Sequence, residues 1–510
     1  MIYSWFNSIV KGYLRYRYSR IQKMYLDPVT LQTDQLAMLL ENLKSTHYGL
    51  AYDVNSVKTY DDFRSALPVV EYEDLYPFIR RTMMGEDSIL WPGKTDHFAK
   101  SSGTTNDRSK FIPITEHNLF ENHITSSWDA MSILYSIQPD ARIFEGKTLL
   151  IGGSLSTYPD NPSVTIGDVS AILMSNMPMV ARPFYTPNME IALMNEWESK
   201  LEKTAEDSMK VDVVNFAGVP TWTIVLFKKI LEKTGATHML EVWPNLKTYL
   251  HGGVNFEPYV NQFKELIPSD DFLYMEVYNA SEGYFSFQDQ KDDKSMLLLL
   301  DNAVFYEFIP LDDYHNGQKN AIPIWDAEPG VQYVIVISTS SGLWRYLPGD
   351  TVVFTTVKPY RIKITGRSKH FINVFGEEVM VSNTDQALKL TCDRFNVQVT
   401  DYTAAPVFMD EKGKGGHEWL VEFIHPPADL PAFTKALDLN LQKINSDYEA
   451  KRHRDIALQN LILHAVPSGT FLQWLKSKGK MGGQNKVPRL SNKRDTLEEI
   501  LRFTKDSNTL

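Results

Sequence analysis

The stretch Ser101-Ser102-Gly103-Thr104-Thr105-Asn106-Asp107-Arg108-Ser109-Lys110 decides how the rest of the chain is interpreted. Hydroxyl side chains surround one glycine, and a lysine comes five residues after Thr105. In such a turn, backbone N–H and hydroxyl groups converge on a polyphosphate, and the lysine adds a point charge. A polar surface loop is the alternative interpretation of these residues. The stretch therefore predicts a phosphate-binding loop only if motifs elsewhere in the chain support it.

The segments that flank this loop predict strands alternating with helices. Residues 96–100 lead into the loop as a strand, 111–114 leave it as another, and Thr115 with Asn118 is typical of a cap for a helix over 119–134. Four further buried strands are expected over 147–153, 212–216, 246–254 and 272–278. An apolar helix that ends at Leu231 is expected after the second of them. Such alternation favours mainly parallel sheets, whose ligands bind beyond the carboxyl ends of the strands.

From residue 296 onward the pattern changes to short strands. These are expected over 296–300, 304–310, 331–338, 351–356 and 361–365. The fold class is therefore α/β, with a large N-terminal domain over 1–365 of mainly parallel α/β sheets, which includes a β-rich subdomain over about 296–365. A hinge at 366–369 leads to a small mobile C-terminal α/β domain over 366–510, with strands at 398–406 and 418–424 and helices at 430–444 and 468–478.

Composition excludes several classes of protein. The chain has 510 residues, 43% of them hydrophobic, and a net charge of −11, which argues against general nucleic-acid binding. A single cysteine, Cys392, excludes an internal disulfide and a cysteine-based zinc site. It suits a reducing compartment, so we expect a cytoplasmic protein. No run approaches the ~18 apolar residues of a membrane span.

The N-terminus has a charge pattern of its own. Residues 1–23 contain five basic residues, no acidic residue and many aromatic ones. The charges follow the apolar part, whereas a signal peptide would place them before it. Such a helix either makes peripheral contact with a membrane surface or an acidic partner, or packs on its own domain, which is the commoner outcome.

Several familiar motifs are absent, and what remains is an ordered set. Two Gly-Lys-Thr triplets, at 93–95 and 146–148, lack the earlier glycine of a P-loop, and neither an HExxH helix nor a GxSxG elbow occurs. The remaining motifs are the loop at 101–110, His251-Gly252-Gly253, Tyr278-Asn279-Ala280-Ser281-Glu282, Tyr346-Leu347-Pro348-Gly349-Asp350, Gly366-Arg367-Ser368-Lys369, Gly376-Glu377-Glu378, 445–452 and Gln484-Asn485-Lys486-Val487-Pro488-Arg489.

In this order the motifs resemble the acyl-adenylate-forming superfamily, which includes luciferases and acyl-CoA ligases. The closer similarity is to the auxin-responsive Gretchen Hagen family of acyl acid-amido synthetases. It rests on the double serine, the gap to Lys110, Pro113, and the stretches 278–282, 447–452 and 486–489. The resemblance covers about residues 30 to 495.

The resemblance implies a role for each motif. A hydroxyl loop and lysine would hold the ATP phosphates, glycines and a tyrosine the adenine, an aspartate and an arginine the ribose, and a glutamate would hold Mg²⁺, which prefers oxygen ligands. A mobile lysine would neutralise charge at the α-phosphate, swung there about a hinge at Lys369. The residues implied for the phosphates are Ser101, Ser102, Gly103, Thr104, Thr105 and Lys110. Those implied for the adenine are Gly252, Gly253 and Tyr278, with Ser281 beside them. Asp350 and Arg367 would hold the ribose, Glu282 would hold Mg²⁺, and Lys486 is the mobile lysine.

By the same analogy, the acid would bind beside the helix that follows the 212–216 strand. Trp222 on this apolar stretch is as well explained by the core. If it lines the pocket, an aromatic or medium-length apolar acid fits better than a charged one. The pocket residues implied are Val219, Thr221, Trp222, Val225, Val254 and Phe256.

The implied reaction is ATP-dependent adenylation of a small carboxylic acid and transfer of the acyl group to an amine, with an amino acid as the expected acceptor. The products are an amide conjugate, AMP and pyrophosphate. Two departures keep alternatives open. Asn106 and Asp107 replace a glycine pair of the family, and 366–373 is closer to general adenylating enzymes. An acyl-CoA ligase and a non-catalytic adenylate-binding protein are the alternatives.

Overall fold

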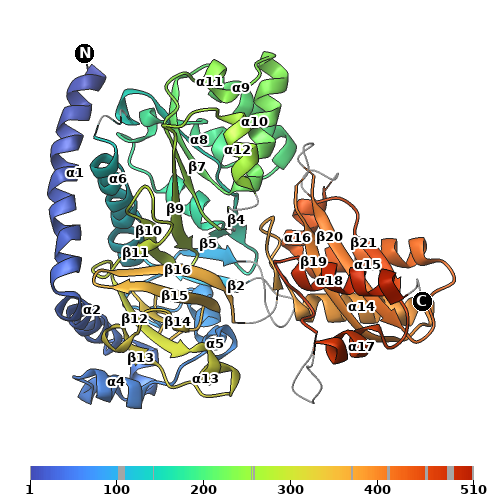
Figure 1. The fold of residues 1–510 in the computed structure, drawn as a ribbon. Helices are drawn as coiled ribbons and strands as arrows, with labels where there is room; N and C mark the ends of the chain where they lie inside the picture. The colour runs from blue at the N-terminus through green and yellow to red at the C-terminus, as the bar shows by residue number, and fades with distance from the viewer. Residues whose placement is uncertain are drawn as a thin grey trace.

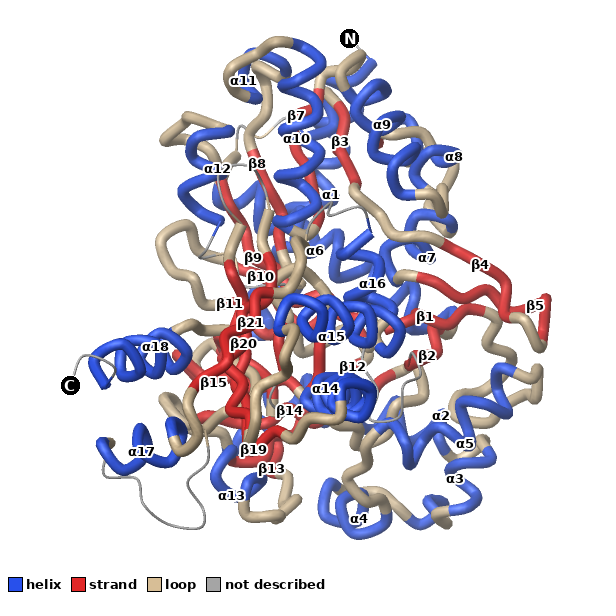
Figure 2. Tube along the Cα trace, turned by 90° about the vertical axis from the view of Figure 1, so that its right-hand side faces the viewer, coloured by secondary structure: helices blue, strands red, loops and turns tan. Residues whose placement is uncertain are grey.

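The computed structural model describes residues 2–101, 110–139, 141, 143–253, 256, 259–368, 371–409, 414–453, 458–478 and 487–507. Figure 1 shows a large body, coloured blue to yellow, and a smaller orange and red body beside it. In Figure 2 the smaller body faces the viewer. The mixed α/β fold class predicted from the sequence is confirmed.

One sheet of twelve strands runs through the large body. Its first part is parallel, as predicted, and β9 and β10 then begin an antiparallel part. The β-rich segment predicted over about 296–365 therefore continues the parallel sheet, because the unpredicted strand β10 joins the two parts. The order across the sheet is β13(Ile322–Pro323), β12(Val304–Pro310), β14(Gln332–Thr339), β15(Asp350–Val357), β16(Tyr360–Arg367), β11(Met296–Leu298), β10(Gly283–Gln288), β9(Leu273–Ala280), β8(Thr248–His251), β7(Val213–Gly218), β3(Lys147–Leu150), β6(Tyr185–Thr186).

A second sheet of four strands carries the predicted phosphate loop. β1(His97–Ser101) pairs with β2(Lys110–Ile114) in antiparallel fashion, with Ser101 opposite Lys110, so residues 102–109 join two paired strands. β5(Asn161–Gly167) lies parallel to β1 on its other side and pairs with β4(Leu155–Tyr158). The sequence predicted β1 and β2 but neither β4 nor β5.

Helices cover these sheets, and one of them has the predicted cap. Thr115 Oγ1 accepts a hydrogen bond from the Asn118 N–H group at 3.0 Å, where a π-helix over Asn118–Ile124 starts and continues into α6. The α-helices of the large body are α1(Ile2–Leu26), α2(Pro28–Leu43), α3(His47–Ala51), α4(Tyr60–Ala66), α5(Tyr72–Met83), α6(Thr125–Ile137), α7(Val169–Ser175), α8(Met189–Ala192), α9(Trp197–Ser208), α10(Pro220–Thr234), α11(Met239–Val242), α12(Val260–Leu266) and α13(Leu311–His315).

The basic N-terminal helix α1 packs on its own body, beside α6 (Figure 1). Leu14 and Ile21 are fully buried, and Arg17 forms a buried ion pair of 2.7 Å with Asp129. The described residues of α1 therefore pack on their own domain, which was one of the two alternatives for this segment. In the part of the chain that the structure describes, no helix has the length and apolar character needed to cross a membrane.

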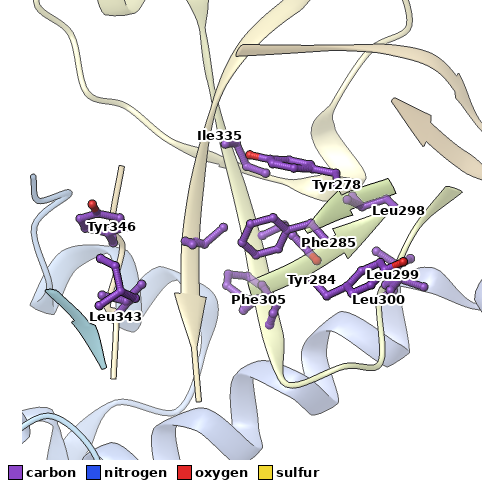
Figure 3. Packing of buried hydrophobic residues seen from close by; sticks show 14 of the residues in the cluster. Tyr278, Tyr284, Phe285, Leu298, Leu299, Leu300, Phe305, Ile335, Leu343 and Tyr346 are labelled. Carbon is purple, nitrogen blue, oxygen red and sulfur yellow. The ribbon is translucent and has the colours of Figure 1, made fainter. Parts of the chain in front are cut away.

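Beneath the centre of the large sheet lies the main core, part of which Figure 3 draws. The ring of Tyr278 meets that of Phe285 edge to face, with 5.0 Å between centroids. Phe285 and Ile335 are wholly buried. Each such side chain stabilises the fold by about 1.5–3 kcal/mol. The core thereby holds the end of β9 rigidly.

The smaller body has a three-stranded sheet with helices against it. Its elements are β17(Phe371–Ile372), β18(Val379–Met380), α14(Val381–Phe395), β19(Val399–Val407), β20(Gly416–Phe423), α15(Leu430–Ile444), α16(Ser446–Arg452), β21(Ile462–Val466), α17(Thr470–Ser477) and α18(Asp495–Ser507). Two hydrogen bonds from α12 and the residue before it reach this body: the Tyr259 hydroxyl donates to the Val374 carbonyl and the Gln262 amide to that of Met409, both at 2.9 Å.

The chain leaves the large sheet slightly later than the sequence predicts. Gly366 and Arg367, placed in the hinge, are still paired with Thr351 and Asp350 at the end of β16. The Ser368 N–H group then donates to the Gly349 carbonyl at 2.7 Å. Lys369, the expected pivot, lies outside the described residues.

Candidate active site

A cavity of about 880 Å³ lies between the two bodies. Tyr278 and Asp350 line it from the large body, and Asp447 and Lys451 from the smaller one. Residues that follow the parallel strands β7 and β8, among them Val219 and Gly253, also line it. The cavity thus opens at the carboxyl ends of the parallel strands, where the fold class places ligands.

The carboxylate of Asp350 is fixed from two sides. Its Oδ2 accepts a hydrogen bond of 2.5 Å from the Tyr278 hydroxyl, and its Oδ1 lies 2.7 Å from Arg367 Nε. Arg367 also donates to the Pro348 carbonyl and to Glu378 Oε1, both at 3.0 Å. Burial and then the Asp350 charge raise the pKa of Tyr278 well above its usual value. The tyrosine therefore stays a hydrogen-bond donor.

The same arginine keeps its positive charge. Burial lowers the pKa of Arg367, but the charges of Asp350 and Glu378 outweigh that effect and raise it overall. Arg367 ends β16 in the large sheet, whereas Glu378 follows it in the smaller body. The guanidinium group of Arg367 therefore contacts both Asp350, the carboxylate predicted to bind ribose, and Glu378 of the Gly376-Glu377-Glu378 motif.

Glu282 follows β9 and is only 7% exposed. Burial raises its pKa, and the positive charges of Lys110 and Arg367 partly oppose that rise. Lys110 begins β2 opposite Ser101, and its ammonium group lies 5.8 Å from the centroid of the Tyr72 ring. The cavity wall thus brings a buried carboxylate and two cations together.

Within the described ranges, no cluster of three or more His, Cys, Asp or Glu side chains could hold a metal ion. Mg²⁺ needs no such cluster when phosphates supply other ligands, because it is commonly held by one or two carboxylates and substrate phosphates. Glu282 meets that requirement. The donor set of the cavity therefore fits a magnesium–nucleotide complex.

Two glycines after β8 allow the backbone to come close to its neighbour. A Cβ atom on Gly252 would lie 2.4 Å from the carbonyl oxygen of Val277, so no side chain fits there. Gly253 has a φ of 81°, which favours glycine, and lines the cavity. The strand exit thus presents bare backbone to a ligand, as an adenine slot requires.

The predicted acid pocket lies at the start of α10. Val219 is the N-cap residue, and both Val219 and Trp222 line the cavity. The ammonium group of Lys451, from the smaller body, lies 5.0 Å from the centroid of the Trp222 ring. Trp222 is therefore partly buried at the boundary of the two bodies.

Most of the described candidate residues line the cavity, whereas Val225, Gly252 and Phe256 are not among its lining residues. The cavity is lined by Ser101, Lys110, Val219, Trp222, Gly253, Tyr278, Ser281, Glu282, Asp350 and Arg367. Gly252 precedes Gly253 in the chain and packs against Val277. Outside the description lie Ser102, Gly103, Thr104, Thr105, Val254, Lys486 and the side chain of Thr221.

Lys200 belongs to no motif and was not predicted as a site residue. This residue of α9 is buried, lines the cavity, and donates to the carbonyl oxygens of Gly152 and Gly153 at 2.7 and 2.6 Å. Burial lowers its pKa to about 8, and the charge of Asp168 acts in the opposite direction. The glycine pair Gly152-Gly153 ends a predicted strand, but Lys200 lies 47 residues after Gly153, so the sequence did not indicate that they are in contact.

Family models match most of the chain: the GH3 family N-terminal domain over residues 17–272, the central domain over 297–367 and the C-terminal domain over 382–495. The chain belongs to the GH3 family. The Gretchen Hagen resemblance seen in the motifs is thereby confirmed.

Among relatives of this GH3 protein is the indole-3-acetic acid-amido synthetase GH3.4 of Arabidopsis thaliana, 22% identical over 92% of this chain and 90% of the relative. The 4-substituted benzoates-glutamate ligase GH3.12 of the same plant is 21% identical, with 89% and 94% covered. The jasmonoyl–L-amino acid synthetase JAR4 of Nicotiana attenuata is 22% identical, with 76% and 75% covered.

Solved structures support the same fold. The GH3.15 acyl acid amido synthetase superposes with a TM-score of 0.60 at 16% identity, covering 95% of both chains. The 2-hydroxyisobutyryl-CoA ligase, in complex with its acyl-AMP and CoA, gives 0.55 at 14%, covering 96% of this chain and 93% of that one. At these identities the similarity speaks for the fold alone.

Proposed function

We propose that this GH3 protein is an ATP-dependent ligase that adenylates a small carboxylic acid and transfers the acyl group to the amine of an amino acid. The observation that carries the proposal is the single cavity in which Lys110, Glu282, Asp350 and Arg367 meet. The amido synthetase names of the GH3 relatives support the same reaction.

Nucleotide binding is assigned to the residues already described. Asp350, held between Tyr278 and Arg367, would accept hydrogen bonds from the ribose hydroxyls in a fixed orientation. Gly252 and Gly253 would admit the adenine. Lys110 and the hydroxyl loop from Ser101 would hold the phosphates, and Glu282 would bind Mg²⁺. Lys110, Gly253, Glu282 and Asp350 line one cavity, so a bound nucleotide would reach all four.

The reaction consists of two transfers. In the first, a carboxylate oxygen bonds to the α-phosphorus of ATP and pyrophosphate leaves. In the second, the amine nitrogen bonds to the acyl carbon, the carbon–oxygen bond to phosphate breaks, AMP leaves with the bonding electrons, and the amine loses a proton. Lys110 and Lys486 would stabilise the negative charge that develops in the first step.

The smaller body would supply Lys486 for the first transfer and turn away for the second. The sequence predicts the boundary of the mobile domain at residue 366, with residues 1–365 as the fixed part; because Gly366 and Arg367 still pair in β16, we place the boundary just after them. Arg367 then lies next to the pivot and contacts Glu378 across it. Such a rotation needs only a few backbone angles to change.

The acid would lie along α10, against Val219, Thr221, Trp222 and Val254. This apolar wall favours an aromatic or medium-length apolar acid, and the indole, benzoate and jasmonate named for the relatives are of that kind.

The test is a reaction panel analysed by mass spectrometry. Purified protein is incubated with ATP, Mg²⁺ and indole-3-acetate, jasmonate or substituted benzoates, with either amino acids or coenzyme A as acceptor. An amide product supports the proposal. A thioester product instead would identify an acyl-CoA ligase. Absence of acid-dependent pyrophosphate exchange with every acid would favour an adenylate-binding protein that does not turn over.

A further inference from the structure

One part of the cavity wall is not among the residues assigned above to ATP or to the acid. It is the turn Gly152–Gly153–Ser154 after β3, with Lys200 on one side and Asp168 on the other. Lys200 is 5% exposed and donates to two carbonyl oxygens of this turn. An ammonium group has three donors. Within the described residues the turn takes up two of these donors, which leaves one for a ligand.

Asp168 is held tightly on the same turn. Its Oδ2 accepts a hydrogen bond of 2.8 Å from the Ser154 N–H group. A Cβ atom on Gly153 would lie 1.9 Å from that oxygen, so the carboxylate rests directly on the glycine backbone. Asp168 and Lys200 influence each other electrostatically but form no ion pair. The turn therefore presents two separate, opposite charges to the cavity.

The strand registers place this turn between the two other predicted subsites. β3 pairs in parallel with β7, with Leu150 opposite Ala217, so the turn lies at the sheet edge from which Val219 continues into the acid pocket. β5 pairs in parallel with β1, with Gly167 opposite Ala99, so Asp168 lies beside the end of β1, where the phosphate loop starts. The acyl group and the α-phosphate would meet between those two subsites.

We propose that Lys200 and Asp168 form the subsite for the acceptor amino acid, with the α-carboxylate bound to Lys200 and the α-amino group beside Asp168. This inference rests on the proposed function. A free amino acid carries both charges on neighbouring carbons, which matches a cation from α9 and an anion after β5 that are held against one short turn. The acid substrate carries a single carboxylate, which has to face the α-phosphate instead.

The experiment compares twenty L-amino acids with their α-amides as acceptors, in amide formation with the acid found active. The amide keeps the amine and the side chain but lacks the carboxylate charge. We expect the parent protein to prefer the amino acids. Lys200→Met should reduce that preference at least about tenfold, since a hydrogen bond to a charged group is lost. Lys203→Met, an exposed lysine of the same helix, is the matched control and should keep the preference.

A purely structural role of Lys200 would give a different result. Damage to the turn would slow amino acids and amides equally, so an unchanged preference in Lys200→Met overturns the proposal. A higher KM for the acid in pyrophosphate exchange would also overturn it, because Lys200 would then bind the acid. Lys200→Arg, which keeps the charge, should restore part of the preference.

Asp168→Asn offers an independent variant, because an amide oxygen can still accept from Ser154. It should raise the KM for amino acids and for their amides alike, since both carry the amine; unchanged KM values would remove Asp168 from the subsite. Failure of the proposed function looks different: the parent protein itself would show no acid-dependent pyrophosphate exchange.

Discussion

Removal of one hydroxyl group, in Tyr278→Phe, tests whether Asp350 is held as the site requires. The hydroxyl donates to Asp350 Oδ2 at 2.5 Å, while Arg367 holds the other oxygen. Tyr278 is 6% exposed as a whole residue, and in the variant its ring stays packed against Phe285, so little else changes. A hydrogen bond to a charged group contributes about 1.5–3 kcal/mol, and we expect the free energy of unfolding to fall by that amount.

The matched control is Tyr274→Phe in the same strand. The Tyr274 hydroxyl is buried and has no hydrogen-bond partner within the described residues. Its removal should change the free energy of unfolding by less than about 0.5 kcal/mol, as expected where no hydrogen bond is broken. Unfolding of the large body in urea, monitored by circular dichroism, gives the free energy of unfolding of both variants.

The same pair of variants reports on nucleotide binding. With one of its two anchors lost, Asp350 should bind ribose less well, so Tyr278→Phe should raise the KM for ATP about tenfold, equivalent to about 1.4 kcal/mol, and change kcat little. Equal effects of the Tyr278 and Tyr274 variants on both stability and KM would refute the reasoning. They would mean that the short contact with Asp350 contributes nothing.

Three further predictions concern the chemistry. Lys486→Ala should lower acid-dependent pyrophosphate exchange by about 10²-fold or more and leave the aminolysis of a supplied acyl-adenylate much less changed; equal losses in both would make Lys486 structural. Because the pKa of Glu282 is raised, this carboxylate takes up a proton at a higher pH than an ordinary glutamate, so Mg²⁺ affinity should begin to fall early on acidification. Lys110→Met should move that fall to still higher pH in a magnesium titration, and an unmoved profile would contradict the pairing. Trp222→Ala should lower kcat/KM for aromatic acids about tenfold or more by removing apolar contact area, and an unchanged acid preference would place Trp222 in the core.

Elements with strong local patterns could be predicted well from the sequence. The strand over Val304–Pro310 and the helix over Leu430–Ile444 have the bounds expected of them. In both, the apolar spacing and the flanking residues agree, so local and tertiary preferences coincide. The family resemblance was similarly visible, because its motifs occur in a fixed order along the chain.

Long-range pairing was harder to predict. β10 is buried throughout, so it lacks the alternation that identifies a half-buried strand, and its place beside β11 and β9 follows from tertiary pairing. β4 is short and has no buried residue, and β5 is buried only in its second half, where it pairs with β1, so neither strand has a clear local pattern.

In the candidate site, too, residues in local motifs could be predicted and long-range contacts could not. Lys110, Glu282 and Asp350 could be selected because each lies in a motif. The contact between Tyr278 and Asp350 spans 72 residues, and that between Lys200 and Gly153 spans 47, so no spacing rule predicts either. Site residues that lie outside any motif can be identified only once the strand registers are known.

The continuity of the twelve-stranded sheet limits how the protein can be divided for expression. The N-terminal family model ends at residue 272 and the central one begins at 297, yet β9 and β10 lie between them and are hydrogen-bonded to both sides. A fragment that stops at 272 would leave the edge of β8 open, and one that starts at 297 would leave that of β11 open. Open edges of apolar strands recruit other chains. Such fragments should therefore aggregate, and any useful truncation has to keep both halves of the sheet and cut after Ser368.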